Sequence, residues 1–136
     1  MSIAQQNDVR VWQERFGLPA PPTPQNIDYS RAVERVGYLI EEGVDEYLAA
    51  VQANDLVEIA DALGDALWII LGTAVEHGIY LQPIFDAISE SNFSKLDADC
   101  KPVPHPTIPG KIGKSSLYKP PTDAIRAALI RQGAWQ

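Results

Sequence analysis

Acidic residues open a stretch, residues 56–75, that is otherwise apolar enough to form a buried helix. Glu58, Asp61 and Asp65 lie in it, and the stretch contains no Lys or Arg. Removing an unpaired carboxylate from water costs several kcal/mol, so such residues persist where a cation or a donor compensates them. Clustered carboxylates without basic neighbours are typical of a hard divalent metal site, most often for Mg²⁺. The sequence therefore predicts helices that bring carboxylates together around metal.

A second acidic cluster lies at residues 41–46, which read Glu-Glu-Gly-Val-Asp-Glu. On a helical wheel of about 100° per residue, Glu41 and Asp45 lie beside the apolar stripe of their helix, and Glu42 and Glu46 lie farther out. Taken alone, this cluster is as typical of a solvated helix face as of a site. The wheel favours Glu41, Glu42 and Asp45 as metal ligands and leaves Glu46 as an alternate.

The two clusters together predict phosphate chemistry. Glu58, Asp61 and Asp65 share a narrow arc of their helix, and antiparallel packing of the two helices would turn both acidic arcs toward one cavity. Mg²⁺ keeps waters and takes few protein carboxylates, while substrate phosphates complete its shell. Two or more such ions activate a water and stabilise a leaving pyrophosphate, and Mn²⁺ is expected to substitute. We expect Asp61 and Asp65 as ligands, with Glu58 as an alternate.

Capping signals and apolar spacing predict helices and no strand. The first helix is expected at about residues 3–16, with Ser2 as N-cap and Gly17 as stop, and a stiff Pro-rich arm follows it. Further helices are expected at about residues 29–53, 55–77, 82–93 and 122–133. Their start and stop signals are Asp28, Asn54 or Asp55, Gly78 and Thr122.

The segment between the last two predicted helices is irregular. Residues 94–121 contain six prolines and two glycines without a sustained apolar period. The chain is therefore expected to be all-α and to form one domain. Its core is expected at about residues 28–97, its N-terminal helix and Pro-rich linker at 1–27, and its tail at 98–136.

Charge and composition narrow the possible partners. The formal net charge of −7 over 136 residues argues against a nucleic-acid polymer as a partner. Residues 1–93 carry a net charge of −11 and residues 94–136 a net charge of +4. Such a distribution suits an anionic ligand that carries metal ions, or a tail that neutralises its own or a neighbouring subunit's acidic part. A membrane partner is not expected, and the single Cys100 fits a reducing cytoplasm.

The two acidic clusters together resemble the signature of the all-α nucleoside triphosphate pyrophosphohydrolases. This superfamily includes MazG-like proteins, dimeric dUTPase-like proteins and phosphoribosyl-ATP pyrophosphohydrolase. Its signature is two glutamates, two residues and a third glutamate, followed on the next helix by Glu-x-x-Asp. Glu41, Glu42 and Asp45 match the first half with Asp as its last member. A register one residue later uses Glu42 and Glu46 instead.

The second half of the signature is also open to two registers. Asp65 precedes an Ala-Leu-Trp-Ile-Ile run, as the family's Asp precedes a similar run, and Ala62 then stands where the family has Glu. In this register Asp61, one turn earlier, supplies the missing oxygen. In the alternative register, which lies one turn earlier along the helix, Glu58 and Asp61 match the literal Glu-x-x-Asp spacing.

The resemblance covers about residues 28–97 and implies a four-helix-bundle core of the MazG-like type. It also implies a homodimer or homotetramer with sites near subunit interfaces. The segment 91–95 resembles the family's Asn-x-Ser-Lys segment, which implies that Asn92 and Lys95 contact the nucleotide. Basic and aromatic residues of the tail are candidates for a loop that closes over phosphates: Lys111, Lys114 and Tyr118.

We therefore expect a Mg²⁺-dependent cytoplasmic enzyme that hydrolyses a (deoxy)nucleoside triphosphate to the monophosphate and pyrophosphate. Glu41 and Glu42 are its expected catalytic residues. Trp68 and Tyr38 border the acidic arcs and favour a purine nucleotide such as dGTP. Two alternatives stay open: a phosphoribosyl-ATP pyrophosphohydrolase and, because of Ala62, a non-catalytic helical module that binds metal or nucleotide.

Overall fold

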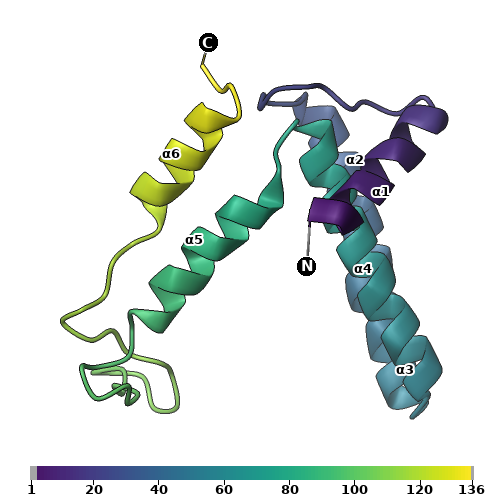
Figure 1. The fold of residues 1–136 in the computed structure, drawn as a ribbon. Helices are drawn as coiled ribbons and strands as arrows, with labels where there is room; N and C mark the ends of the chain where they lie inside the picture. Colours follow the sequence, from purple (N-terminus) through teal and green to yellow (C-terminus); the bar gives the residue numbers. More distant parts are fainter. Residues whose placement is uncertain (1–2, 136) are drawn as a thin grey trace.

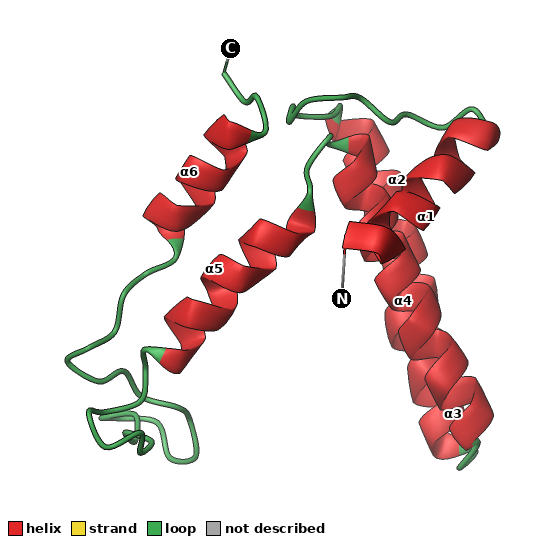
Figure 2. Cartoon of the chain, viewed as in Figure 1, coloured by secondary structure: helices red, strands yellow, loops and turns green. Residues whose placement is uncertain are grey.

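The computed structural model describes residues 3–135, and every regular element in them is a helix (Figures 1 and 2). In chain order the elements are α1 (Ile3–Arg15), α2 (Tyr29–Ile40), η1 (Glu41–Glu46), α3 (Tyr47–Gln52), α4 (Leu56–Glu76), α5 (Leu81–Phe93) and α6 (Thr122–Arg131). The described residues contain no strand beyond an isolated bridge between Pro104 and Ile112. The predicted all-α class is confirmed.

The ends of α4 form where its local signals predict. The side chain of Asp55 accepts hydrogen bonds from the backbone N–H groups of Val57 and Glu58, so it caps the helix as expected. Gly78 follows the helix with φ at +68°, in the left-handed region that glycine adopts at little cost. A Cβ at Gly78 would also collide with the backbone of Thr23, because the Pro-rich linker crosses there.

Other expected caps differ from the structure. Asp28 occupies the N-cap position of α2, but its side chain makes no capping hydrogen bond. Pro121, not Thr122, occupies the N-cap position of α6, because the helix already includes Thr122. Proline suits such a place, since it has no N–H group to satisfy. Ser2, the expected cap of α1, lies outside the described residues.

The helix predicted over residues 29–53 contains a wider turn in its middle. Glu41–Glu46 form a π-helix, η1, between α2 and α3. A π-turn pairs each carbonyl with the N–H group five residues on, so it holds one more residue than an α-turn. The helix is therefore present as predicted, but its winding changes within the acidic cluster.

Helices α1 to α4 form an N-terminal lobe (Figure 1). The segments α2, η1 and α3 pack along α4 as a hairpin, and α1 packs on α4 as well. Val9 of α1 and Leu71 and Val75 of α4 form the buried apolar cluster of this lobe. A Cβ added at Gly43 would lie 3.4 Å from the Cβ of Ala66, so η1 and α4 approach closely. The two acidic segments thus lie side by side.

Helices α5 and α6 and the irregular segment between them form a C-terminal lobe, which leaves the N-terminal lobe at an angle (Figure 1). Two glutamine side chains bind the backbone that joins the lobes. Gln6 donates to the carbonyl of Ile79 at 2.6 Å and accepts from the N–H of Leu81 at 2.8 Å. Gln132 accepts from the N–H of Tyr80 at 2.9 Å and donates to its carbonyl at 3.1 Å. These four bonds fix the direction in which α5 leaves α4.

Apolar side chains are exposed on both lobes. They lie on the hairpin and on α5 and include Val33, Val36, Ile40, Leu48, Phe85, Ile88 and Phe93. Exposed apolar surface of this extent is typical of a face that another protein surface covers. Among residues 3–135, no helix has the length and apolar character that crossing a membrane requires.

Candidate active site

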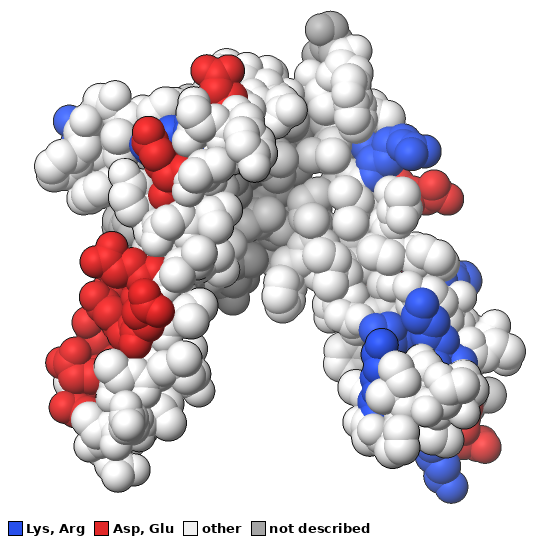
Figure 3. All heavy atoms as spheres, turned by 180° about the vertical axis from the view of Figure 1, so that it is seen from behind, with Lys and Arg blue, Asp and Glu red and all other residues white. Residues whose placement is uncertain are grey.

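Carboxylates from both halves of the hairpin line one pocket, of about 650 Å³. None of the described residues that line it is Lys or Arg. We call it the acidic pocket, and its lining residues are Glu42, Glu46, Ala49, Ala50, Ala53, Asp55, Glu58, Asp61 and Asp65. Figure 3 shows acidic side chains gathered on the N-terminal lobe, and basic ones gathered on the C-terminal lobe. The acidic pocket therefore carries strong negative charge that no described residue of its lining compensates.

Three of these carboxylates converge. One oxygen each of Glu42, Glu46 and Asp65 lie within 4.8 Å of one another. The close approach of Glu46 favours a proton held on Glu42 and raises its pKa to about 7, and burial and the charges of Asp65 and Glu41 act in the same direction. Like charges at this separation repel unless a proton or a metal ion compensates them.

Glu42 and Glu46 point the same way because residues four apart lie on one face of a helix, and the π-turn changes the winding between that face and α2. The wheel assumes about 100° per residue, and this assumption does not hold within η1. In the family signature the third glutamate follows the second after two residues, whereas Glu46 follows Glu42 after three. In the structure, Glu42 and Glu46 lie on the face of η1 that meets Asp65 of α4.

The other predicted ligands divide between two places. Asp61 and Glu58 line the acidic pocket, one and two turns before Asp65 along α4, respectively. Glu41 lines a neighbouring pocket instead. Asp45 is exposed and lines neither of the two. Ala62, which stands where the family has Glu, is buried in the hairpin and supplies no oxygen there.

A second pocket, of about 350 Å³, adjoins the acidic pocket, because Glu42 lines both. We call it the aromatic pocket, and its lining residues are Trp12, Gln13, Leu18, Arg31, Arg35, Tyr38, Glu41, Glu42, Trp68 and Ile69. The rings of Trp12 and Trp68 meet edge to face, with centroids 5.8 Å apart. Flat apolar walls with a few charged groups at fixed places are typical of a site for a heteroaromatic ligand.

A buried ion cluster supports the wall of the aromatic pocket. Glu76 is 1% exposed, and its Oε1 accepts from Nε of Arg31 at 2.8 Å. Its Oε2 lies 3.1 Å from Nε of Arg35. Arg35 donates from Nε to Thr73 Oγ1 and from Nη2 to the carbonyl of Ile69. Glu76 lowers the cost of burial, although burial still lowers the pKa of Arg35.

Sequence reasoning did not single out this cluster. Glu76 lies more than forty positions from either arginine in the sequence, so no local spacing connects it to them. The available signal was Glu76 itself, an acidic residue at the end of the apolar run Leu-Gly-Thr-Ala-Val. Such a residue in a buried helix predicts a cationic partner from another element.

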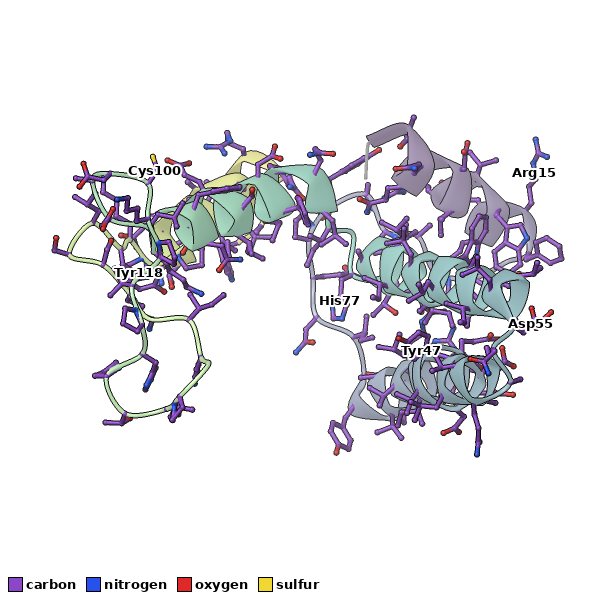
Figure 4. All side chains as sticks on the ribbon, turned by 90° about the horizontal axis from the view of Figure 1, so that it is seen from below. Arg15, Tyr47, Asp55, His77, Cys100 and Tyr118 are labelled. Carbon is purple, nitrogen blue, oxygen red and sulfur yellow. The ribbon has the colours of Figure 1, made fainter. Side chains whose placement is uncertain are left out.

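The predicted nucleotide-binding residues lie in the C-terminal lobe. Nζ of Lys95 donates to Oδ1 of Asn92 at 2.9 Å, and both line a small apolar pocket. Nζ of Lys114 lies 4.6 Å from the ring centre of Tyr118, and Lys111 is exposed. Figure 4 shows Tyr118 and Cys100 on the opposite side of the molecule from Tyr47 and Asp55. Within one chain, the tail candidates are therefore distant from the acidic pocket.

Comparisons with known proteins agree with this arrangement. Residues 9–92 match the family model of phosphoribosyl-ATP pyrophosphohydrolase. A search of curated proteins finds no match. Among solved structures, a protein of Exiguobacterium sp. 255-15, described as a candidate NTP pyrophosphohydrolase, is similar with a TM-score of 0.54 and 27% identity. That similarity covers 94% of this chain and 95% of the other. The chain belongs to the phosphoribosyl-ATP pyrophosphohydrolase family and is a pyrophosphohydrolase of the NTP-cleaving type.

Proposed function

We propose that this enzyme hydrolyses a deoxynucleoside triphosphate, dGTP, to dGMP and pyrophosphate with Mg²⁺ as its metal. The observation that carries the proposal is the convergence of Glu42, Glu46 and Asp65 in a pocket that no described cation lines. Three carboxylates at one point are costly unless a positive ion joins them. Carboxylate oxygens are also the ligands that Mg²⁺ and Mn²⁺ prefer.

The residues present fit a divalent ion. Oε2 of Glu42 is buried and has no hydrogen-bond partner among the described residues. A buried oxygen without a donor is costly, and a metal ion would satisfy it. Glu46 and Asp65 are exposed, so an ion can enter from solvent. Glu58 and Asp61 face the same pocket and would hold a second ion.

The chemistry follows from the two pockets. Mg²⁺, when bound, neutralises phosphate charge and lowers the pKa of a bound water. Glu42, Glu46 and Asp65 would hold the ion whose charge binds the triphosphate end, and Glu41 takes the proton from the attacking water as general base. The water oxygen bonds to the α-phosphorus, the bond from this phosphorus to the α–β bridging oxygen breaks, and pyrophosphate leaves. Asp45 has no part in this proposal.

The aromatic pocket is the proposed site of the base. It adjoins the acidic pocket through Glu42, so one nucleotide spans both. Trp12, Tyr38 and Trp68 offer flat surfaces for a purine. An arginine of this pocket suits the O6 and N7 acceptors of guanine. This donor favours guanine over adenine, which has an amino group in place of O6.

The positive charge that a triphosphate requires comes from a second copy in this proposal. The basic residues gather on the C-terminal lobe, and the acidic pocket lies on the other lobe (Figure 3). We propose a homodimer or homotetramer in which one copy brings its C-terminal lobe to the acidic pocket of another. Exposed apolar residues on the hairpin and α5 support such contacts. The nucleotide-binding residues would be Asn92, Lys95, Lys111, Lys114 and Tyr118.

Phosphoribosyl-ATP is the second candidate substrate, because the family model that matches residues 9–92 carries that activity in its name. It also holds a triphosphate that is cleaved to a monophosphate and pyrophosphate. Either substrate places the reaction in the cytoplasm, where nucleotides and Mg²⁺ are abundant.

The test is release of pyrophosphate from the common ribo- and deoxynucleoside triphosphates and from phosphoribosyl-ATP, with Mg²⁺ or Mn²⁺. We expect turnover that requires metal, is fastest with dGTP and is abolished in Asp65→Ala. Asp123→Ala is the matched control, because this side chain of α6 is fully exposed. Absence of turnover for every triphosphate by a folded protein would refute the proposal. Equal activity in Asp65→Ala would refute the site.

A further inference from the structure

The ion cluster of Glu76, Arg31 and Arg35 is more elaborate than the packing of α2 on α4 requires. A buried ion pair commonly stabilises a fold no better than apolar residues of the same volume. Here a fully buried carboxylate binds two guanidinium groups, and both of these line the aromatic pocket. A function in the pocket accounts for the charge, whereas helix packing alone does not.

Gly72 of α4 leaves the space that the guanidinium of Arg35 occupies. A Cβ at this residue would lie 2.7 Å from Nη2 of Arg35 and 2.6 Å from Oε1 of Gln13. Glycine weakens a helix interior, so its presence mid-helix suggests a close approach. The guanidinium of Arg35 therefore lies against α4, in the space that a side chain at residue 72 would occupy.

The exposed part of Arg35 belongs to the aromatic pocket. Its side chain is 9% exposed, and the residue lines that pocket. Its hydrogen bonds to Thr73 and Ile69 use Nε and Nη2, so neither uses Nη1. Tyr38, another wall of the pocket, has its ring 5.7 Å from the guanidinium. Arg35 thus has a fixed orientation and donor capacity left over.

We propose that Arg35 is a specificity-determining residue that donates hydrogen bonds to the N7 and O6 edge of a purine, and that Glu76 is the residue that positions it. This inference rests on the proposed function. Arginine pairs with two acceptors on one edge through its planar fork, which is the preferred contact with guanine. Glu76 acts through Arg31 and Arg35 and touches no substrate.

The experiment compares kcat/KM for dGTP with that for 7-deaza-dGTP, which lacks the N7 acceptor and keeps the rest of the base. We expect the wild type to favour dGTP by at least about tenfold. Arg35→Lys and Glu76→Gln are expected to bring the ratio close to one, mainly through KM. A residue with a merely structural role would lower both rates and leave the ratio unchanged.

Gly72→Ala tests the same point without changing any charge, in case Glu76→Gln does not fold. Its Cβ displaces the guanidinium, so the ratio should again fall. Gly64→Ala is the matched control on the same helix, since an added Cβ there meets nothing within 4 Å. It should retain the wild-type ratio.

The outcomes separate the two proposals. No turnover of any triphosphate by the wild type refutes the proposed function. Turnover with a dGTP ratio near one in the wild type, or turnover of pyrimidines alone, overturns the inference and leaves the function standing. An undiminished ratio in folded Arg35→Lys and Gly72→Ala also overturns it.

Discussion

The two lobes carry opposite charge and are organised in different ways. In the N-terminal lobe, regular helices place carboxylates from two segments within 4.8 Å of one another. In the C-terminal lobe, the lysines lie on an irregular segment held by scattered hydrogen bonds, such as the one that Ser115 Oγ donates to the carbonyl of Ser94. Metal ligation requires fixed geometry, whereas attraction of a phosphate requires charge nearby. In the proposed function, the N-terminal lobe therefore holds the reaction centre, and the C-terminal lobe supplies positive charge that attracts the phosphates.

The largest effect is expected at the point shared by both pockets. Glu42→Gln should lower kcat by about 10³-fold or more, because it removes a ligand from the group that compensates phosphate charge. Pyrophosphate release at saturating metal measures it. Asp123→Asn, in the C-terminal lobe, is the control and should retain activity. Comparable losses in both variants would contradict the assignment of chemistry to the N-terminal lobe.

The next effect concerns two adjacent carboxylates of η1. Glu46→Gln should lower kcat/KM by about 10²-fold and weaken metal binding, because Glu46 converges with Asp65. Asp45→Asn should change either quantity less than about threefold, since Asp45 lies outside the pocket. Titration of activity with Mn²⁺ measures both. A reversed order of the two losses would favour the register that the helical wheel indicates.

A smaller effect is expected from the lysines of the tail. Replacing Lys111 and Lys114 together by alanine should raise KM about tenfold at low salt, with little change in metal affinity. The difference from wild type should shrink as salt rises. Mixing this variant with Glu42→Gln should restore part of the activity, because hybrid assemblies would contain an intact site. If the mixture recovers no activity, the proposal that the C-terminal lobe of one copy serves the acidic pocket of another is contradicted.

The smallest expected effect is on stability. In the metal-free fold the pKa of Glu42 is about 7, above its usual 4.5, so the folded state holds a proton that the unfolded chain releases earlier. This stabilisation is complete below about pH 4.5 and is lost as the pH rises through 7. Thermal unfolding of metal-free protein should therefore show a fall in Tm across this range. The Glu42→Gln variant should show a smaller fall in Tm over this pH range. A fall of the same size in that variant would exclude Glu42 as the cause of the pH dependence.

Helix ends were predictable where one residue decides them. Asp55 caps α4 through its own side chain, and Gly78 ends it through its own φ. The π-turn was not predictable from a wheel, since the wheel assumes the winding that η1 changes. Glu76 signals a cationic partner, but which residues pair with it was not predictable, because they come from another helix. Local rules thus locate helices, whereas the convergence of their side chains depends on tertiary packing.

Gln6 and Gln132, which bind the backbone between the two lobes, hold the point about which α5 could rotate relative to the N-terminal lobe. Helix α5 has 13 residues and begins directly at this point. At 1.5 Å per residue it extends about 20 Å, so a rotation of about 10° at the connector moves its far end by roughly 3 Å. Asn92 lies at that end, and 3 Å is the length of a hydrogen bond. The position of residues at the far end of α5, such as Asn92, therefore depends on the hydrogen bonds that Gln6 and Gln132 make at its start.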